Sequence, residues 1–306
     1  MPLARTARRM NAPARAPAPS RRIENTAIAA LLAGGCAIAF APIFVRLADV
    51  GPVASGFWRV ALAAPLLWIW AYSARRPDAP RGGALPLPVM LAGLFFAGDL
   101  GVWHLSILYT SVANATLLAN LAPIFVAIGG YLLFGQRVTP LFLLGMVTAM
   151  AGAFVLVGPS FAAGGRQLAG DALGVLTAAF YGAYFLAIKH LRDSRSTAAI
   201  MAASTTVTAA VLLPVAAATG EAMLPASASG WLVLAGLALV CQVGGQSLIA
   251  YAMAHLPASF SAVSLLIQPV MATLYAWVLL GEAVGPAQIV GGVVVLAGIY
   301  VARRGS

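Results

Sequence analysis

The sequence predicts an all-α integral membrane protein of ten transmembrane helices, arranged as two inverted five-helix repeats. Three observations lead to this prediction: a composition that is 61% hydrophobic and only 8% charged, a series of long apolar segments, and an internal repeat. A water-soluble domain carries about 25% charged residues. Because so few charges cannot cover a water-facing surface, lipid must surround most of the molecule.

The first 22 residues differ from the rest of the chain, since they contain six arginines among alanines and prolines and show no apolar periodicity. We expect residues 1–24 to form a disordered basic tail in the cytoplasm. A cleavable signal peptide is the alternative, but its removal would delete a helix that the repeat requires. The net charge of +10 does not indicate a nucleic-acid-binding protein, because the basic residues lie between apolar segments and form no single patch.

Apolar stretches of about 18 residues or more are long enough to cross a bilayer as helices. Ten such stretches follow the tail, and short segments with glycine, proline or charged residues separate them. Their expected bounds are 25–46, 52–73, 86–108, 111–134, 139–158, 170–190, 197–219, 230–253, 257–280 and 285–302. The breaks near Thr110 and after Gly281 are so short that hydropathy alone fits nine helices as well as ten.

The positive charges of the loops favour ten helices and indicate their orientation. With the N-terminus in the cytoplasm, fifteen Lys and Arg residues fall in cytoplasmic segments, whereas only Arg46 and Arg166 fall outside. This bias follows the positive-inside rule, and a count of nine helices would destroy it. We therefore expect a multi-pass protein of a bacterial-type inner membrane, with both termini in the cytoplasm.

The internal repeat is five helices long. A shift of 146 residues gives ten identities in 33 ungapped positions over 123–155, among them Pro123 on Pro269, Gly135 on Gly281 and Gly152 on Gly298. Because five is an odd number, the second copy crosses the membrane in the opposite direction, as in many secondary transporters. The expected parts are a first repeat at 25–158, an outer connecting loop at 159–169, a second repeat at 170–302 and a cytoplasmic tail at 303–306.

Two helix-ending patterns resemble those of EamA-type transporters of the drug/metabolite transporter superfamily. They are Ala122-Pro123 with Leu133-Phe134-Gly135-Gln136, and Gln268-Pro269 with Leu279-Leu280-Gly281-Glu282. Phe57-Trp58-Arg59 is similar to that family's second helix, and the resemblance extends over about 25–302. Gln136 departs from the pattern, since the family usually has glutamate there. The resemblance implies an exporter of amino acids, other metabolites or drugs, and the YddG-type aromatic amino-acid exporters are one branch.

Polar side chains inside the predicted helices are the candidates for a substrate cavity. Asp99 leads them, because a charge at the bilayer centre costs roughly 2.5–3.5 kcal/mol and usually faces a cavity or a partner. A shift of 143 residues places Gln242 on Asp99 and Gln246 on Trp103. The candidates are Asp99, Trp103, Asn114, Asn120, Tyr181, Tyr184, Gln242, Gln246, Ser261, Ser264 and Gln268. Hydrogen bonding between helices is the alternative role for the amides and hydroxyls among them, and packing is the alternative for the two tyrosines.

Arg59 lies at a depth similar to that of Asp99 on the preceding helix, and we expect the two to form an ion pair, directly or through water. In the alternative interpretation, Asp99 faces the cavity as a proton carrier. Pro123 and Pro269 should kink their helices, because a proline cannot donate the i→i−4 hydrogen bond. We expect these prolines to be the hinges of alternating access, with static kinks as the alternative.

The sequence therefore predicts a secondary transporter that exports small molecules across the membrane. Its expected partners are a small-molecule substrate, the lipid bilayer and, as the candidate coupling ion, protons; nucleic acid is not among them. The chain has no Walker loop, no metal-ligand spacing and no paired intramembrane carboxylates, so we expect neither an enzyme nor a metal or cofactor site. A passive small-solute channel and a membrane-embedded transferase are the alternatives.

Overall fold

The structure is a computed structural model that describes residues 21–74, 86–110, 112–157, 165–192 and 194–306. Within these residues, ten helical spans are long and apolar enough to cross a membrane, which confirms the predicted number. The elements are α1 (Arg21–Ile38), α2 (Ala41–Leu47), α3 (Pro52–Ser73), α4 (Leu87–Tyr109), α5 (Val112–Ala119), α6 (Ala122–Phe134), α7 (Pro140–Val157), α8 (Gly165–Arg192), α9 (Thr197–Ala218), α10 (Ala228–Gly236), the π-helical segment η1 (Leu237–Gln246), α11 (Ser247–Ala252), α12 (Ala258–Ser264), α13 (Ile267–Leu280) and α14 (Pro286–Arg304).

Several helices extend beyond the apolar stretches that predicted them. α1 begins at Arg21, α8 begins at Gly165 within the segment expected to be a loop, and α14 continues to Arg304. Hydropathy marks only the part of a helix inside lipid, whereas the backbone hydrogen bonds continue through a polar turn at its end. The remainder of the expected basic tail, residues 1–20, and residues 158–164 of the expected outer loop lie outside the described residues.

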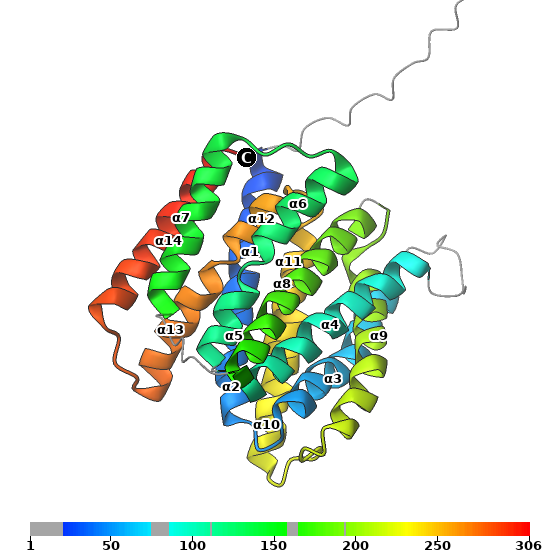
Figure 1. Cartoon of the computed structure of the whole chain (residues 1–306). Coiled ribbons are helices and arrows are strands. Elements are labelled where there is room, and N and C mark those ends of the chain that lie inside the picture. The colour runs from blue at the N-terminus through cyan, green and yellow to red at the C-terminus, as the bar shows by residue number, and fades with distance from the viewer. Residues whose placement is uncertain (1–20, 75–85, 111, 158–164, 193) are drawn as a thin grey trace, which may run out of the picture.

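The helices form one bundle in which the two repeats are interleaved (Figure 1). The most extensive contacts join a helix of the first repeat to a helix of the second: α7 to α14, α4 to α8, and α3 to α9. Exchanging the repeats converts the α4–α8 contact into the contact of α1 with η1 and α11, and leaves α7–α14 and α3–α9 as they are. This twofold pattern is the one that an isologous interface has. The structure therefore shows two inverted five-helix repeats within one body.

α7 and α14 lie side by side at the edge of the bundle and pack through glycines (Figure 1). A Cβ atom at Gly152 would lie 2.5 Å from the Val295 amide nitrogen and 2.8 Å from the Gly291 carbonyl oxygen. Gly298, the repeat partner of Gly152, faces the backbone of Ala149 in the same way. Only residues without a side chain allow backbones this close, as in other packed membrane helices.

We expect Gly152→Val to destabilise the protein, because the added side chain must push the two backbones apart. Overpacking of this kind costs about 1–3 kcal/mol, so the melting midpoint in detergent should fall by roughly 2–10 °C. Gly165→Ala is the control, since a Cβ atom there meets nothing within 4 Å. An unchanged midpoint for Gly152→Val would show that the α7–α14 contact is looser than the structure has it.

Three of the ten spans are each broken into two helices. The first is divided between α1 and α2, the fourth between α5 and α6, and the ninth between α12 and α13. In each case a proline stands in the first turn after the break, namely Pro42, Pro123 and Pro269. A proline cannot donate a hydrogen bond to the residue four positions earlier and clashes with that turn, so the break precedes it. The three breaks surround one cavity, described next.

Candidate functional site

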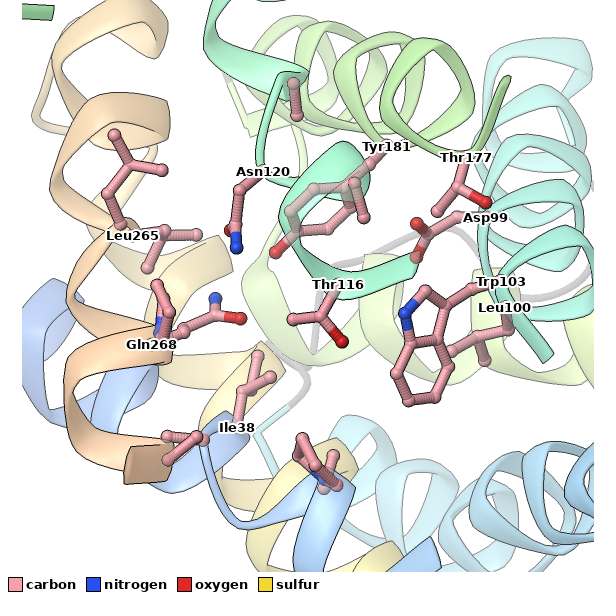
Figure 2. A pocket seen from close by; sticks show the side chains of 18 of the residues that line it. Ile38, Asp99, Leu100, Trp103, Thr116, Asn120, Thr177, Tyr181, Leu265 and Gln268 are labelled. Carbon is pink, nitrogen blue, oxygen red and sulfur yellow. The ribbon is translucent and has the colours of Figure 1, made fainter. Parts of the chain in front are cut away.

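A cavity lies where the three broken spans meet α3, α4, α8 and η1. Its empty volume is about 840 Å³, part of which is open space at its mouth. Figure 2 shows Asp99 and Trp103 on one side of this cavity, Asn120 and Gln268 on the other, and Thr116 and Tyr181 between them.

A larger hollow, of about 1560 Å³ with the open space at its mouth included, connects this cavity to one face of the bundle. We call the face at which α1 begins and α14 ends the terminal face, and the other the opposite face (Figure 1). The larger hollow is lined by Arg46 near the end of α2, Val157 at the end of α7 and Glu282 after α13, all at the opposite face. Both hollows are lined by Pro42, Thr116, Pro269 and Ala272. The cavity therefore opens to the opposite face.

The terminal-face side of the cavity is closely packed. The hollow there has a volume of only about 170 Å³ and is lined by the buried side chains of Tyr184, Phe185 and Met253, among others. Lys189 near the end of α8 donates a hydrogen bond of 2.9 Å to the Met253 carbonyl, just beyond α11. A cation at a helix C-terminus is stabilised by the helix dipole. This contact ties α8 to α11 on the closed side.

Asp99 and Arg59 bring opposite charges to the same cavity without pairing with each other. Asp99 is only 9% exposed and Arg59 only 6% exposed, and both line the cavity. Within the described residues the ion pair of the structure is Arg46–Glu282, so the expected direct pair of Arg59 with Asp99 is wrong. A pair bridged by water stays a prediction. The carboxylate of Asp99 has neither an ion pair nor a hydrogen bond to any described residue.

The guanidinium of Arg59 is held back by other groups. Its Nε donates a hydrogen bond of 3.1 Å to Oε1 of Gln242, and its Cζ lies 5.7 Å from the centre of the Phe96 ring. Gln242 is fully buried and its amide in turn donates to the Thr205 hydroxyl over 3.1 Å. Two unpaired charges in a buried site are unfavourable unless a partner reaches them. This arrangement leaves both charges available to a bound molecule.

The structure brings together most of the predicted site residues. The following of them line the cavity: Arg59, Asp99, Trp103, Asn120, Tyr181, Gln246, Gln268, Pro123 and Pro269. They come from spans of both repeats, so the cavity lies at the repeat interface, as is usual for inverted-repeat transporters. The hydroxyl of Tyr181 lies beside the side-chain amides of Gln246 and Gln268.

Five predicted cavity residues lie elsewhere. Gln242 instead holds Arg59 in place, as described above. Ser261 and Ser264 donate to carbonyls of their own helix at 2.9 and 2.8 Å, an arrangement open to any serine in a membrane helix. Tyr184 is a packing aromatic that stacks on Phe96 at 4.6 Å. Asn114 is buried beside Thr110, to whose hydroxyl it donates over 3.4 Å.

Pro42 and Thr116 are among the cavity residues that were not predicted. The signal for Pro42 was present, because Ala41-Pro42-Ile43-Phe44-Val45 repeats the residue types of 122–126. Thr116 stands four residues before Asn120, hence on the same helix face. The π-helical turns around Gln242, in contrast, had no sequence signal; such turns are rare and occur often at functional sites.

The rim of the open hollow carries the Arg46–Glu282 ion pair, whose side chains are 65% and 46% exposed. The repeat places Lys189 opposite Arg46 and Gln136 opposite Glu282. The equivalent positions thus hold one cation, Lys189, and one neutral side chain, Gln136, and these two residues cannot form an ion pair. Exposed ion pairs stabilise by about 0–1 kcal/mol, so the rim pair is a weak contact between α2 and the end of α13.

The comparisons with known proteins agree with this architecture. The EamA-like transporter family matches residues 25–158 and 168–304. An uncharacterized transporter of Archaeoglobus fulgidus is 26% identical over 268 residues, which cover 84% of this chain and 90% of the relative. A probable terminal-alkyne amino-acid exporter of Streptantibioticus cattleyicolor is 29% identical over 273 residues, which cover 88% and 89%. A crystal structure with a TM-score of 0.76 and 20% identity covers 92% of this chain and 97% of its own, and shows the same fold.

The two matched segments each contain one five-helix repeat and together cover nearly all of the chain. This family consists of transporters and not of enzymes. A cavity that opens to one face of a membrane-spanning bundle agrees with that function. The chain therefore belongs to the EamA-like transporter family and is a multi-pass membrane transporter.

Proposed function

We propose that the protein is a secondary transporter that exports amino acids by alternating access. The observation that carries the proposal is the pair of separated charges, Asp99 and Arg59, in one cavity. A zwitterionic amino acid has an ammonium group that can pair with Asp99 and a carboxylate that can pair with Arg59. Its binding would therefore give each of these two buried charges a partner. The indole of Trp103 beside Asp99 adds an apolar and aromatic wall. The Streptantibioticus cattleyicolor relative, named for an amino-acid substrate, supports this class.

Alternating access is supported by the unequal ends of the cavity. A passive channel needs a path to both faces, whereas this cavity has a wide hollow toward the opposite face and a small one toward the terminal face. With the termini in the cytoplasm of a plasma membrane, as the loop charges indicate, the structure corresponds to an outward-open state. A buried carboxylate facing the cavity also makes Asp99 the candidate site for a coupled proton.

The proposal is tested with the purified protein in proteoliposomes. We expect saturable counterflow of radiolabelled amino acids, aromatic and aliphatic, with weaker binding of the amines that lack the carboxylate and of the acids that lack the amine. Flux that does not saturate would favour the passive channel. If quaternary ammonium dyes are transported at the same rate as amino acids, the proposal of a zwitterionic substrate is wrong. The result would indicate a drug exporter.

A further inference from the structure

A second group of polar atoms lines the cavity from its middle to the side away from Asp99. The Thr116 hydroxyl, Nδ2 of Asn120 and Nε2 of Gln268 are buried and have no hydrogen-bond partner among the residues that the structure describes. All three residues line the cavity, and Figure 2 shows Asn120 and Gln268 across it from Asp99 and Trp103. Buried polar groups are nearly always hydrogen-bonded, so a group of three without partners in one cavity indicates that a ligand or water completes them.

These atoms stand at two of the helix breaks. Asn120 lies between α5 and α6, and Gln268 lies in the first turn of α13, directly before Pro269. Each break places the C-terminal end of one short helix beside the N-terminal end of the next, so helix dipoles of both signs meet there. The side chains therefore decide what is bound. The amide atoms left without partners are both NH₂ groups, which donate, and the Thr116 hydroxyl both donates and accepts, so these atoms favour a hydrogen-bond acceptor.

We propose that Thr116, Asn120 and Gln268 form a side-chain subsite that selects amino acids whose side chains end in an oxygen acceptor. The inference rests on the proposed function, because the backbone ammonium and carboxylate are assigned to Asp99 and Arg59. The side chain then extends past Tyr181 toward the helix breaks (Figure 2). An amino acid with an apolar side chain of the same length leaves the three polar atoms without partners and displaces the water that would otherwise satisfy them.

L-Glutamine and L-norleucine separate these cases, because they share the amino-acid backbone and a similar side-chain length. We expect the wild-type protein in nanodiscs to bind glutamine about tenfold more tightly than norleucine, as one or two buried hydrogen bonds predict. In Asn120→Leu, Gln268→Met and their combination, this preference should disappear while norleucine binding is retained. Retained norleucine binding also shows that the variants fold.

Two controls make the readout specific. Ser264→Ala removes a buried hydroxyl of the same span that bonds its own helix, and it should leave the preference unchanged. Asp99→Asn should weaken the binding of both amino acids by the same factor, because Asp99 is assigned to the α-ammonium group that both of them have. Equal wild-type affinity for the two amino acids, or a preference that survives the double variant, would overturn the subsite and leave the proposed function standing. Binding of neither amino acid would overturn both.

Discussion

Asp99→Asn is expected to reduce amino-acid transport by about a hundredfold or more. Removing one member of a buried charge pair costs about 3–5 kcal/mol, and each 1.4 kcal/mol is a factor of ten. The substitution keeps the size of the side chain and removes only the charge that meets the substrate ammonium. The measurement is the initial rate of counterflow at substrate concentrations below half-saturation, with the amount of folded protein determined by gel filtration.

The matched control for Asp99→Asn is Glu282→Gln at the rim of the open hollow. Glu282 is also an acidic residue on the path to the cavity, but it is 46% exposed and pairs with Arg46. Its substitution should change the rate by less than about fivefold, since an exposed ion pair contributes about 0–1 kcal/mol. A variant Asp99→Asn that transports amino acids at the wild-type rate would remove this carboxylate from the substrate site.

A double-mutant cycle tests whether water joins Arg59 to Asp99. Arg59→Gln and Asp99→Asn each remove one charge and retain hydrogen-bonding capacity. If a water-bridged pair exists, the loss in the double variant will be smaller than the product of the two single losses. Independent, multiplicative losses would show that each charge meets the substrate separately, which is the arrangement proposed above.

The number of helices and the inverted repeat could be predicted from the sequence because both depend on signals spread over many residues. Ten apolar stretches need no knowledge of packing, and paired glycines such as Gly152 and Gly298 mark equivalent close contacts in both repeats. The αL backbone of Gly135 and Gly281, with φ of 63° and 69°, likewise ends two equivalent spans. Only glycine adopts this conformation without strain, so its position survives in the repeat.

The details of the site depended on the rotation of each helix about its axis, which depth and spacing do not determine. Arg59 and Asp99 lie at similar depths, but Gln242 draws the guanidinium to itself, and the direct ion pair does not form. Ser261 and Ser264 have the spacing of a cavity face, yet their hydroxyls bond the preceding helical turn. A helix break or a π-helical turn also changes which side chains beyond it face the cavity.

The three helix breaks make the two repeats unequal. The fourth and ninth spans are both broken, as the repeat requires, whereas the first span is broken at Pro42 and its counterpart, α8, is continuous. The shift of 143 residues that relates these spans places Phe185 opposite Pro42. Consequently α2 and α13, two short helices that follow breaks, line the open hollow, whereas α6 alone is the corresponding element toward the terminal face. The two gates of an alternating-access cycle would therefore differ in their moving parts.

Replacing the prolines at the breaks should slow transport more than it weakens substrate binding. In Pro123→Ala and Pro269→Ala, the restored amide can continue the helical hydrogen bonds, and proline in a helix interior is about 3 kcal/mol less favourable than alanine. The straight form of each span becomes more stable, so the bending needed for one gate becomes slower. We expect a maximal counterflow rate lower by about tenfold in the double variant, with the binding affinity changed by less than about threefold.

The chain offers its own control for the prolines. Pro65 and Pro214 stand inside α3 and α9, which remain unbroken, and both prolines are exposed toward lipid. Pro65→Ala and Pro214→Ala should therefore leave the rate unchanged, although they alter the same residue type in the same bilayer. When Pro42→Ala is combined with Pro269→Ala, transport should slow further, because the helix breaks at both prolines border the open hollow. If the Pro123→Ala, Pro269→Ala double variant transports at the full rate, then both prolines only shape the cavity, and the moving parts must be sought at Pro42 and in the π-helical turns of η1.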